Sequence, residues 1–527
     1  AEVRCTETAG DGNGATLGSD CLEPSTVWET ALLANAPGSR LRIRLTASAR
    51  KRIFQATAFL DKLVAAEEPI YGINTGFGYF ADVQIPPEKL VELQYNIIRS
   101  HCSNVGEALD RDITLASWLV NLNKFCQGNS GVRLELIETI IKSLEAGILA
   151  VIPSRGSVGA SGDLSSSAHA ARALLGEGLC TYPQNGDFVT VPAAEALAAC
   201  GVAPITLGPK EGLSLVNGTA LTTALAVKAW YVGRRLLRIA NAAAAMTIEA
   251  LGGARWICAQ RTVRAHRHRG TIQCGAEIAG WLGKRSEMAY RHVDKQWIQD
   301  PYSMRCAPQV HGAVWEEIDA SESILRNEIN AATDNPLLFP EEMCVSNTGN
   351  FHAIYPARVS DRLASALATL ASISERRINQ AMCAKRKHLP TFLVQNGGLN
   401  SGFMMAHVTA AALVSEAKSL SMPASVDSIP TNIEQEDHVS MGPIAGFKAI
   451  RILDNLRGVL SIELLCAAQA FDLLAPAKPS PALAELHAEI RKLVPPLEQD
   501  RSLSEDIEAI SLAIQQGSFM CRQVRSA

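Results

Sequence analysis

This 527-residue sequence has few aromatic and few charged side chains for its length. Aromatic residues make up 5% of it and charged residues 19%, whereas hydrophobic residues make up 47%. The formal net charge is −4, so the strongly basic face that nonspecific nucleic-acid binding requires is missing. The composition predicts a globular chain with a sizeable hydrophobic core and no nucleic-acid partner.

Long uninterrupted apolar runs are also missing. The nearest candidate, residues 212–227, contains Asn217 and three threonines and ends before Lys228. A membrane-spanning helix needs about 20 predominantly apolar residues, so we expect no membrane contact. No signal-peptide pattern is visible either.

The sequence contains no cluster of metal-ligating residues and no closely spaced cysteine pair. The 13 cysteines are scattered, their number is odd, and no C-x-x-C pair occurs, which favours reduced, mostly buried thiols in a cytoplasmic protein. His266 and His268 in RAHRHRG lie among arginines, and Cys274 is not at a usual ligand spacing, so no metal site is expected. Nucleotide-binding glycine loops and the nucleophile elbow are missing too.

Most of the chain has a helical pattern. Apolar residues recur at steps of four and three at Leu363, Leu367, Leu370 and Ile373. Gly458 lies inside a long apolar helix, where close packing against another helix is expected. The polar, glycine-rich residues 1–26 are predicted to be a loose N-terminal segment, followed by an N-terminal domain, 27–205, and a long-helix bundle domain, 206–527.

An alanine-rich helix face bears on the oligomeric state. Residues 240–246, ANAAAAM, would be costly to expose to water. A homo-oligomer with closed symmetry is the natural way to cover such a face, and one large internal core is the alternative.

Residues 156–164, GSVGASGDL, have unusually small side chains for a segment that leads into a helix. The glycines at 156, 159 and 162 permit backbone conformations that other residues avoid. Asp163 or a nearby serine could cap the helix that follows. From the residues alone, a tight turn before a capped helix is the simplest interpretation.

The flanking sequence adds a more specific interpretation, because GSVGASGDL followed by a helix that ends in LLGEG closely resembles the prosthetic-group loop of the aromatic amino acid ammonia-lyase and aminomutase family. The resemblance implies that Ala160, Ser161 and Gly162 cyclise, lose two waters and form 4-methylidene-imidazol-5-one (MIO). It extends over residues 27–519. It implies a mainly α, long-helix bundle of the ammonia-lyase (fumarase/aspartase-like) type with a smaller N-terminal part, and a homotetramer whose active sites are shared between subunits.

Further motifs resemble other parts of this family's active site. YGINTGFG places Tyr71 where the family has its tyrosine loop, so the resemblance implies that Tyr71 is the catalytic base. A free tyrosine has a pKa near ~10, so positive neighbours would have to lower that pKa. KEGLSLVNGT places Asn217 where the family uses an asparagine near the prosthetic group.

The segment IQDPYSMRCAPQVHG carries candidates for substrate binding. Tyr302 and Arg305 are three residues apart and share a face if the segment is helical. The resemblance implies that Arg305 clamps the substrate carboxylate through paired N–H donors and that Tyr302 stands near the MIO methylene. Gln299 and Gln309 are further binding candidates, and Phe351 in GNFH could line the ring pocket.

Two positions indicate the substrate. IIRSHCSNVG places His101 at the ring-recognition position, and IEQEDHVSM carries Glu436. A histidine and a carboxylate suit a polar ring that can carry charge, such as imidazole. The pair resembles the histidine-directed branch, histidine ammonia-lyase, and implies a carbon–nitrogen lyase that converts L-histidine to trans-urocanate and ammonia. A purely structural hydrogen bond between His101 and Glu436 is the alternative.

Some positions depart from the family pattern. Ser165, Ser166 and Ser167 replace a less polar stretch, Ile354 stands where a glutamate is common, and residues 124–133 are unusual. A modified imidazole or tyrosine as substrate therefore stays open, as does a 2,3-aminomutase of the same fold. A catalytically inactive helical scaffold is the alternative of another class.

Overall fold

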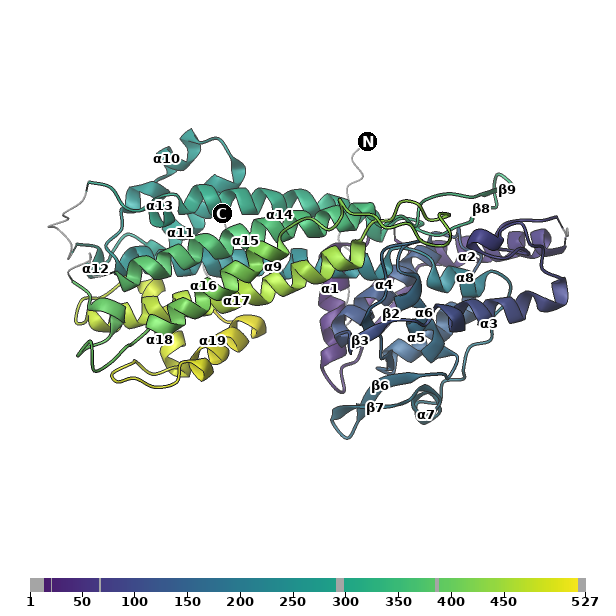
Figure 1. Ribbon diagram of the computed structural model, residues 1–527, viewed down its shortest axis with the longest axis horizontal. Helices are drawn as coiled ribbons and strands as arrows, with labels where there is room; N and C mark the ends of the chain where they lie inside the picture. The colour runs from purple at the N-terminus through teal and green to yellow at the C-terminus, as the bar shows by residue number, and fades with distance from the viewer. Residues whose placement is uncertain (1–13, 20, 66–67, 291–297, 384–387, 520–527) are drawn as a thin grey trace. The chain divides into compact units, whose positions relative to one another are not determined.

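The computed structural model describes residues 14–19, 21–65, 68–290, 298–383 and 388–519. The described chain is mainly α-helical, as predicted, with short strands in small sheets (Figure 1). It forms two compact units, each assembled from several stretches of chain. The first unit comprises 1–231, 321–361 and 423–447, and the second comprises 232–320, 362–422 and 448–527. The domain division at 205/206 stays a prediction.

The first unit combines short helices with small sheets. Its own helices are α1 (Pro24–Leu32), α2 (Ala47–Ala65), α3 (Leu90–His101), α4 (Arg111–Cys126), α5 (Leu134–Glu145), α6 (Leu164–Leu174), α7 (Ala193–Ala199) and α8 (Glu211–Val216). Its strands are β1 (Gly14–Leu17), β2 (Arg42–Leu45), β3 (Val105–Ala108), β4 (Leu149–Ala150), β5 (Pro153–Arg155), β6 (Leu179–Gln184), β7 (Asp187–Pro192), β8 (Leu337–Phe339) and β9 (Cys344–Ser346). They form the sheets β1-β2, β3-β5, β4-β6-β7 and β8-β9, of which β1-β2 is parallel.

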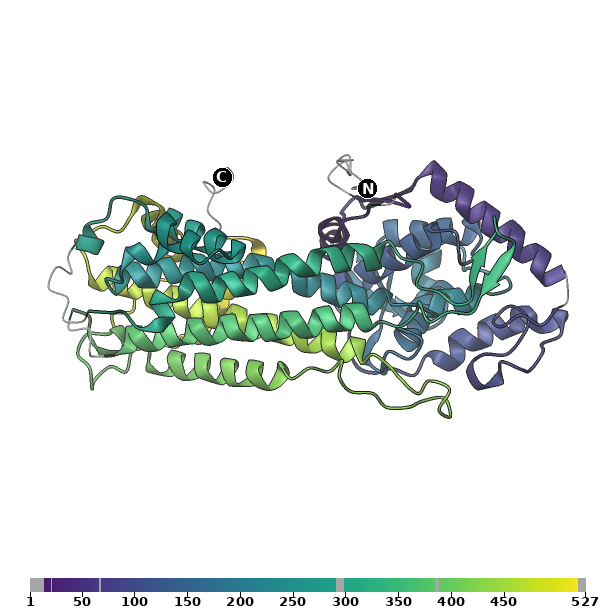
Figure 2. The ribbon, with the colours of Figure 1, turned by 90° about the horizontal axis from the view of Figure 1, so that it is seen from above.

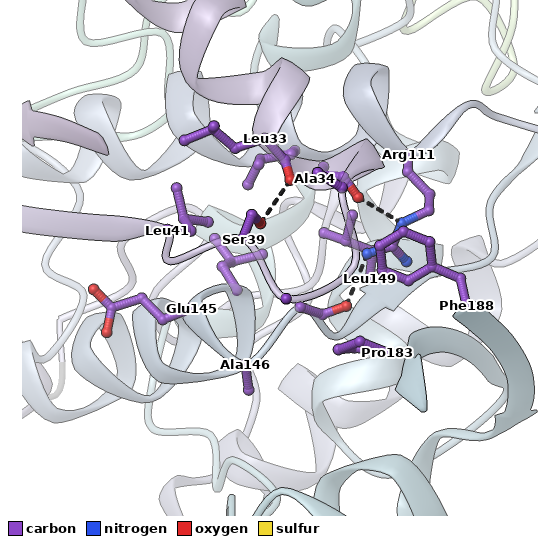
Figure 3. A pocket seen from close by; sticks show the side chains of 15 residues that line it. Leu33, Ala34, Ser39, Leu41, Arg111, Glu145, Ala146, Leu149, Pro183 and Phe188 are labelled. Atoms are coloured by element: carbon purple, nitrogen blue, oxygen red, sulfur yellow. Dashed lines mark hydrogen bonds between the residues drawn. The ribbon is translucent and has the colours of Figure 1, made fainter. Parts of the chain in front are cut away.

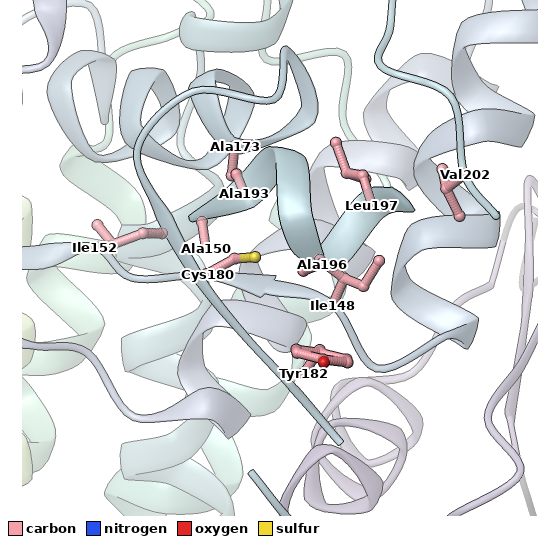
Figure 4. Packing of buried hydrophobic residues seen from close by; sticks show 10 residues of the cluster. All are labelled: Ile148, Ala150, Ile152, Ala173, Cys180, Tyr182, Ala193, Ala196, Leu197 and Val202. Carbon is pink, nitrogen blue, oxygen red and sulfur yellow. The ribbon is translucent and has the colours of Figure 1, made fainter. Parts of the chain in front are cut away.

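A compact apolar cluster anchors α6, the helix that follows the predicted prosthetic tripeptide. The cluster contains Ala173 of α6, Cys180 and Tyr182 of β6, and Ala196 and Leu197 of α7 (Figure 4). Side chains at alternate positions of a strand face the same side, which explains why residues 180 and 182 both enter this cluster. The C-terminal end of α6 is thereby fixed, which in turn holds its N-terminal end beside the tripeptide.

Four long helices contribute residues to both units. They are α9 (Ala220–Ala250), α14 (Ala307–Ile329), α15 (Ile354–Met382) and α17 (Gly442–Leu473). In α15, the apolar residues at steps of four and three are all buried, as their period predicted: Leu363, Leu367, Leu370 and Ile373.

The second unit is a bundle in which α14, α15 and α17 run side by side in both views (Figures 1 and 2). Its further helices are α10 (Gln260–Ala265), α11 (Arg269–Leu282), α12 (Glu287–Tyr290), α13 (Tyr302–Arg305), α16 (Met404–Leu420), α18 (Pro481–Leu493) and α19 (Ser504–Gln516). A Cβ on Gly458 of α17 would lie 2.8 Å from Leu413 Cδ1 of α16. The close helix packing expected at this glycine is confirmed.

Two expectations from composition need correction. Residues 240–246 are buried within the chain itself, so this alanine-rich face gives no reason to expect a partner subunit. Cys21 is disulfide-bonded, so the expectation of reduced thiols is wrong at that residue. The other described cysteines are free, and burial raises the pKa of Cys126, Cys258 and Cys274 to about 12. Across the described ranges, no helix is both long and apolar enough to cross a membrane.

Candidate active site

Ala160 and Ser161 are the central residues of a tight turn that immediately precedes α6. The Gly162 N–H donates to Gly159 O at 3.1 Å and closes the turn. Ser161 has a φ of +47° and Gly162 a φ of +82°, both in the left-handed region. A Cβ on Gly162 would lie 2.0 Å from Gly218 O, so only glycine fits at this position. The tripeptide is therefore curled, with Ser161 in a conformation that is uncommon for a residue other than glycine.

The two backbone groups of Gly218 hold the tripeptide from the side. The Gly218 N–H donates to Ser161 O at 3.2 Å, and the Asp163 N–H donates to Gly218 O at 2.8 Å. Ser157 Oγ donates to Gly162 O at 3.3 Å. Backbone carbonyls on both sides of the turn are thus occupied, which fixes the turn in one position.

Asp163 caps a helix, but not the one predicted. Its carboxylate accepts hydrogen bonds from Thr222 N at 2.9 Å and Thr222 Oγ1 at 2.6 Å, so it caps the start of α9. No side-chain cap is formed at the start of α6. Asp163 is fully buried, and burial raises its pKa to about 6 despite these hydrogen bonds. The carboxylate therefore ties the tripeptide to a helix that begins 57 residues later in the chain.

Asn217 ends α8 and lies directly before the peptide that holds Ser161. Its side chain is buried and donates to Asp334 Oδ1 and to Asn335 O, both at 3.2 Å. Asp334 in turn forms an ion pair with Lys210 at 3.0 Å, and both side chains are 0% exposed. Asn217 is therefore oriented by a buried charge pair, and it does not cap a helix start.

Tyr71 lies in the glycine-rich loop before α3. Its hydroxyl accepts a hydrogen bond from the Gly78 N–H at 3.3 Å. Burial raises the pKa of Tyr71, and the negative charge of Glu436 raises it further. The positive neighbourhood that would lower this pKa is not found among the described residues of the first unit, so this expectation fails there.

His101 is the last residue of α3 and shares its surroundings with Glu436. Burial lowers the pKa of His101, while the backbone at Ile97 and the charge of Glu436 act in the opposite direction. Glu436 accepts a hydrogen bond from Thr431 Oγ1 at 2.7 Å, and His101 Nδ1 lies 3.1 Å from Ser100 Oγ. Each side chain therefore has a partner of its own, and the Glu436 charge acts on both His101 and Tyr71.

Two of the unusual serines at the start of α6 connect it to the chain just after His101. Ser165 Oγ accepts from the Ser103 N–H at 3.3 Å, and Ser166 Oγ accepts from Asn104 Nδ2 at 3.0 Å. Both serines are buried. These positions therefore link the tripeptide helix to the segment that carries the predicted ring-recognition residue.

The backbone carbonyl of Phe351 lies beside the tripeptide. A Cβ on Gly162 would be 3.0 Å from Phe351 O. The next residue, His352, places Nε2 3.2 Å from His438 Nδ1, two residues after Glu436. The loops that carry Phe351 and Glu436 therefore meet, and the lining of a ring pocket by Phe351 stays a prediction.

The remaining predicted residues belong to the second unit. Tyr302 and Arg305 form the ends of α13, and the Arg305 Cζ lies 4.8 Å from the centre of the Tyr302 ring, as their helical spacing predicted. Tyr302 is 71% exposed and Gln299 is exposed. Arg305 Nε and Gln309 Oε1 are buried without a hydrogen-bond partner in the described chain. These two atoms are thus available to a ligand.

A cavity of about 180 Å³ lies elsewhere in the first unit (Figure 3). Arg111 lines it, donating to Ala34 O at 3.0 Å and to Gly147 O at 2.9 Å, with its guanidinium 3.6 Å from the centre of the Phe188 ring. None of the predicted site residues lines this cavity. Its arginine therefore serves to join neighbouring loops.

Sequence reasoning missed the buried charges near the tripeptide. Lys124, Lys210 and Asp334 are 2%, 0% and 0% exposed. The sequence offered one signal for Lys124, which is a lysine within the otherwise apolar and amide-rich run of α4. Charged residues are almost never fully buried unless they are paired, so a lysine in such a run indicates a specific polar contact.

Known proteins resemble this chain over nearly all of its length. The sequence model described as aromatic amino acid lyase matches residues 29–492. The chain belongs to the aromatic amino acid lyase family. The matched region of this family member includes all of the predicted site residues in both units.

Individual relatives show which members of this family the chain is similar to. Histidine ammonia-lyase of Anaeromyxobacter dehalogenans is 44% identical over 482 residues, which cover 91% of this chain and 95% of that protein. The crystal structure of histidine ammonia-lyase from Trypanosoma cruzi is similar with a TM-score of 0.86 and 39% identity, covering 96% of this chain and 93% of the other. Tyrosine aminomutase from Streptomyces globisporus is similar with a TM-score of 0.88 and 32% identity, covering 96% and 97%.

Proposed function

We propose that this protein eliminates ammonia from L-histidine to give trans-urocanate. It is a carbon–nitrogen lyase of the aromatic amino acid lyase family. The observation that carries the substrate assignment is the shared environment of His101, Glu436 and Tyr71, in which one carboxylate acts on both the histidine and the phenol. Close relatives in sequence and in structure that are named histidine ammonia-lyase support the same substrate.

The residues present fit an MIO group at Ala160, Ser161 and Gly162. The turn is already curled by the hydrogen bond between Gly162 N–H and Gly159 O, and a Cβ on residue 162 could not be accommodated. Glycine leaves its amide nitrogen unhindered, and the serine hydroxyl can leave as water. When formed, the group supplies an electrophilic methylene that turns the substrate amine into a better leaving group.

The side chains of the first unit would bind the ring and move the proton. His101 and Glu436 would hold the two imidazole nitrogens, which spares the cost of burying a polar ring without partners, about 1–3 kcal/mol for each unmatched group. Tyr71 would accept the β-proton of the substrate. Because burial raises the pKa of Tyr71, this role requires a positive charge close to the phenol when substrate is bound.

The side chains of the second unit would bind the carboxylate end of the substrate. Arg305 offers a guanidinium whose Nε is buried and without a partner in the described chain, and Gln309 offers a buried Oε1 in the same condition. Two parallel N–H donors match a carboxylate in geometry. Tyr302 and Gln299 are the exposed members of this group. We further propose a homotetramer in which subunits share active sites.

Near-ultraviolet absorbance during incubation with L-histidine tests the proposal. We expect a rising urocanate band with the purified protein and none with Ser161→Ala, which lacks the hydroxyl that MIO formation requires. The matched control is Ser419→Ala, which removes the hydroxyl of an exposed serine of α16 that donates to Ser415 O at 3.3 Å. A flat trace with the unaltered protein would exclude the proposed activity.

A second candidate is a lyase or 2,3-aminomutase that acts on tyrosine. The likeness to tyrosine aminomutase favours it, and His101 could also bind a phenol hydroxyl. A β-amino acid among the products of L-tyrosine would identify this activity. An inactive scaffold would instead retain both waters in the tryptic peptide that spans residues 156–172, which lies between Arg155 and Arg172.

A further inference from the structure

A buried lysine of α4 contacts the peptide next to Asn217. Lys124 is 2% exposed, and its Nζ donates to Ser214 O at 2.8 Å and to Asn217 O at 2.7 Å. Among the described residues, no carboxylate lies within ion-pair distance of this ammonium. The ammonium also contacts the Phe125 ring, whose centre lies 4.7 Å from Nζ. A buried cation that is held by carbonyl oxygens and a ring face, without a paired carboxylate, is costly, and its position calls for an explanation.

The two carbonyls belong to the end of α8. Carbonyl groups at a helix C-terminus lack intrahelical partners and carry partial negative charge, so an ammonium there is favourable. Capping α8 is therefore a sufficient account of the Ser214 contact. The Asn217 contact has a further consequence, because Asn217 O and the Gly218 N–H belong to the same peptide group.

That peptide group connects Lys124 to the tripeptide. The ammonium donates to Asn217 O at 2.7 Å, and the Gly218 N–H on the other side of the peptide donates to Ser161 O at 3.2 Å. A cation on the carbonyl oxygen polarises a peptide and makes its N–H a stronger donor, and linked hydrogen bonds strengthen one another in a low-dielectric interior. Ser161 O would be the carbonyl oxygen of the imidazolone ring.

We propose that Lys124 is a positioning residue that polarises the Asn217–Gly218 peptide and so strengthens the hydrogen bond on the oxygen of Ser161. A stronger donor at this oxygen withdraws electrons from the ring that the tripeptide would form and favours negative charge there. The inference rests on the proposed function, because it concerns the prosthetic group of the same site.

Burial makes the charge of Lys124 sensitive to pH. Burial lowers the pKa of Lys124 to about 8, Asp334 and Asp163 act to raise it, and Lys210 acts to lower it. The ammonium is thus mostly charged at pH 7 and mostly neutral at pH 9. The polarisation of the peptide should weaken over the same range.

Lys124→Met tests the proposal, because methionine is similar in length and carries no charge. The matched control is Lys228→Met, which neutralises a lysine of α9 that is 14% exposed, pairs with Asp110 and Asp112, and has no contact with the tripeptide. Three quantities are measured: the mass of peptide 156–172, the near-ultraviolet difference spectrum against Ser161→Ala, and kcat and KM for L-histidine.

We expect Lys124→Met to keep the peptide two waters lighter while its prosthetic absorbance band shifts relative to the unaltered protein. We expect kcat to fall about 10-fold or more and KM to change less than about twofold, because a weakened donor at a developing negative charge acts mainly on the transition state. Lys228→Met should match the unaltered protein. An unshifted band and an unchanged kcat in Lys124→Met would overturn the proposal.

A titration of the unaltered protein gives an answer even if Lys124→Met does not fold. The prosthetic band should shift between pH 7 and pH 9 with a midpoint near the pKa of Lys124, about 8. A band that stays in place over this range contradicts the proposal. Failure of the proposed function is recognised separately, because peptide 156–172 of the unaltered protein would then keep both waters.

Discussion

The buried ion pair between Lys210 and Asp334 offers a quantitative test of how the site is held together. Both side chains are 0% exposed and 3.0 Å apart, and Asp334 also accepts a hydrogen bond from Asn217. Removing one member of such a pair leaves an unpaired buried charge, which typically costs about 3–5 kcal/mol. Lys210→Met and Asp334→Asn should therefore each lower the apparent thermal midpoint of unfolding strongly.

The double variant Lys210→Met/Asp334→Asn should be less destabilised than the sum of the single variants. It leaves neither charge unpaired, so we expect a coupling free energy of about 1–3 kcal/mol. The measurement is thermal unfolding of the four proteins at one scan rate and one concentration. Lys89→Met serves as a surface control, because Lys89 forms an exposed ion pair with Glu92 and such a pair contributes about 0–1 kcal/mol. Additive shifts of the midpoint, or a single variant as stable as the unaltered protein, would refute the reasoning.

Three further predictions concern the site residues. Glu436→Gln should lower kcat/KM for L-histidine about 10- to 100-fold, because it replaces a charged acceptor of the imidazole. The control Glu434→Gln alters an exposed neighbour and should have no effect. Equal effects of the two variants in a steady-state assay would contradict this prediction. Tyr71→Phe should lower kcat about 10²- to 10⁴-fold, yet it should leave thermal stability nearly unchanged, since the hydroxyl makes a single hydrogen bond of 3.3 Å; retained turnover would rule out Tyr71 as the base. Because burial raises the pKa of Asp163 from 3.8 to about 6, the folded state binds its proton more tightly than the unfolded state. Its contribution to stability is present below about pH 4 and is lost as pH rises through 6, a change of about 3 kcal/mol. The thermal midpoint of Asp163→Asn should thus rise relative to that of the unaltered protein from pH 4 to pH 7, because asparagine does not titrate. A difference between the two midpoints that stays constant would contradict the pKa shift.

Much of the fold follows from local pattern, while long-range pairing does not. The period of Leu363, Leu367 and Leu370 predicted a buried helix face, and the glycine at 458 predicted close packing, because both are properties of one helix. The role of Asp163 was assigned to the wrong helix, since nothing in the sequence states that its carboxylate meets Thr222. Burial of residues 240–246 likewise depends on helices far away in the chain.

The site shows the same division. Motif resemblance singled out Ala160, Ser161 and Gly162, and the neighbouring glycines favoured a tight turn, which the hydrogen bond from Gly162 N–H to Gly159 O confirms. The charges of Lys124 and Asp334 lie 210 positions apart, and only the folded chain places both of them around Asn217. The sequence-based expectation of a lowered pKa for Tyr71 failed in the first unit because burial outweighs every favourable contact there.

Product analysis by proton NMR tests the central claim most directly. L-Histidine is incubated with the purified protein, with L-tyrosine as a parallel substrate, and ammonium is measured in the same samples. The account predicts that L-histidine disappears while trans-urocanate and ammonium appear in equal amounts, and that L-tyrosine is left unchanged. A β-amino acid without ammonium, or turnover of L-tyrosine in place of L-histidine, would contradict it.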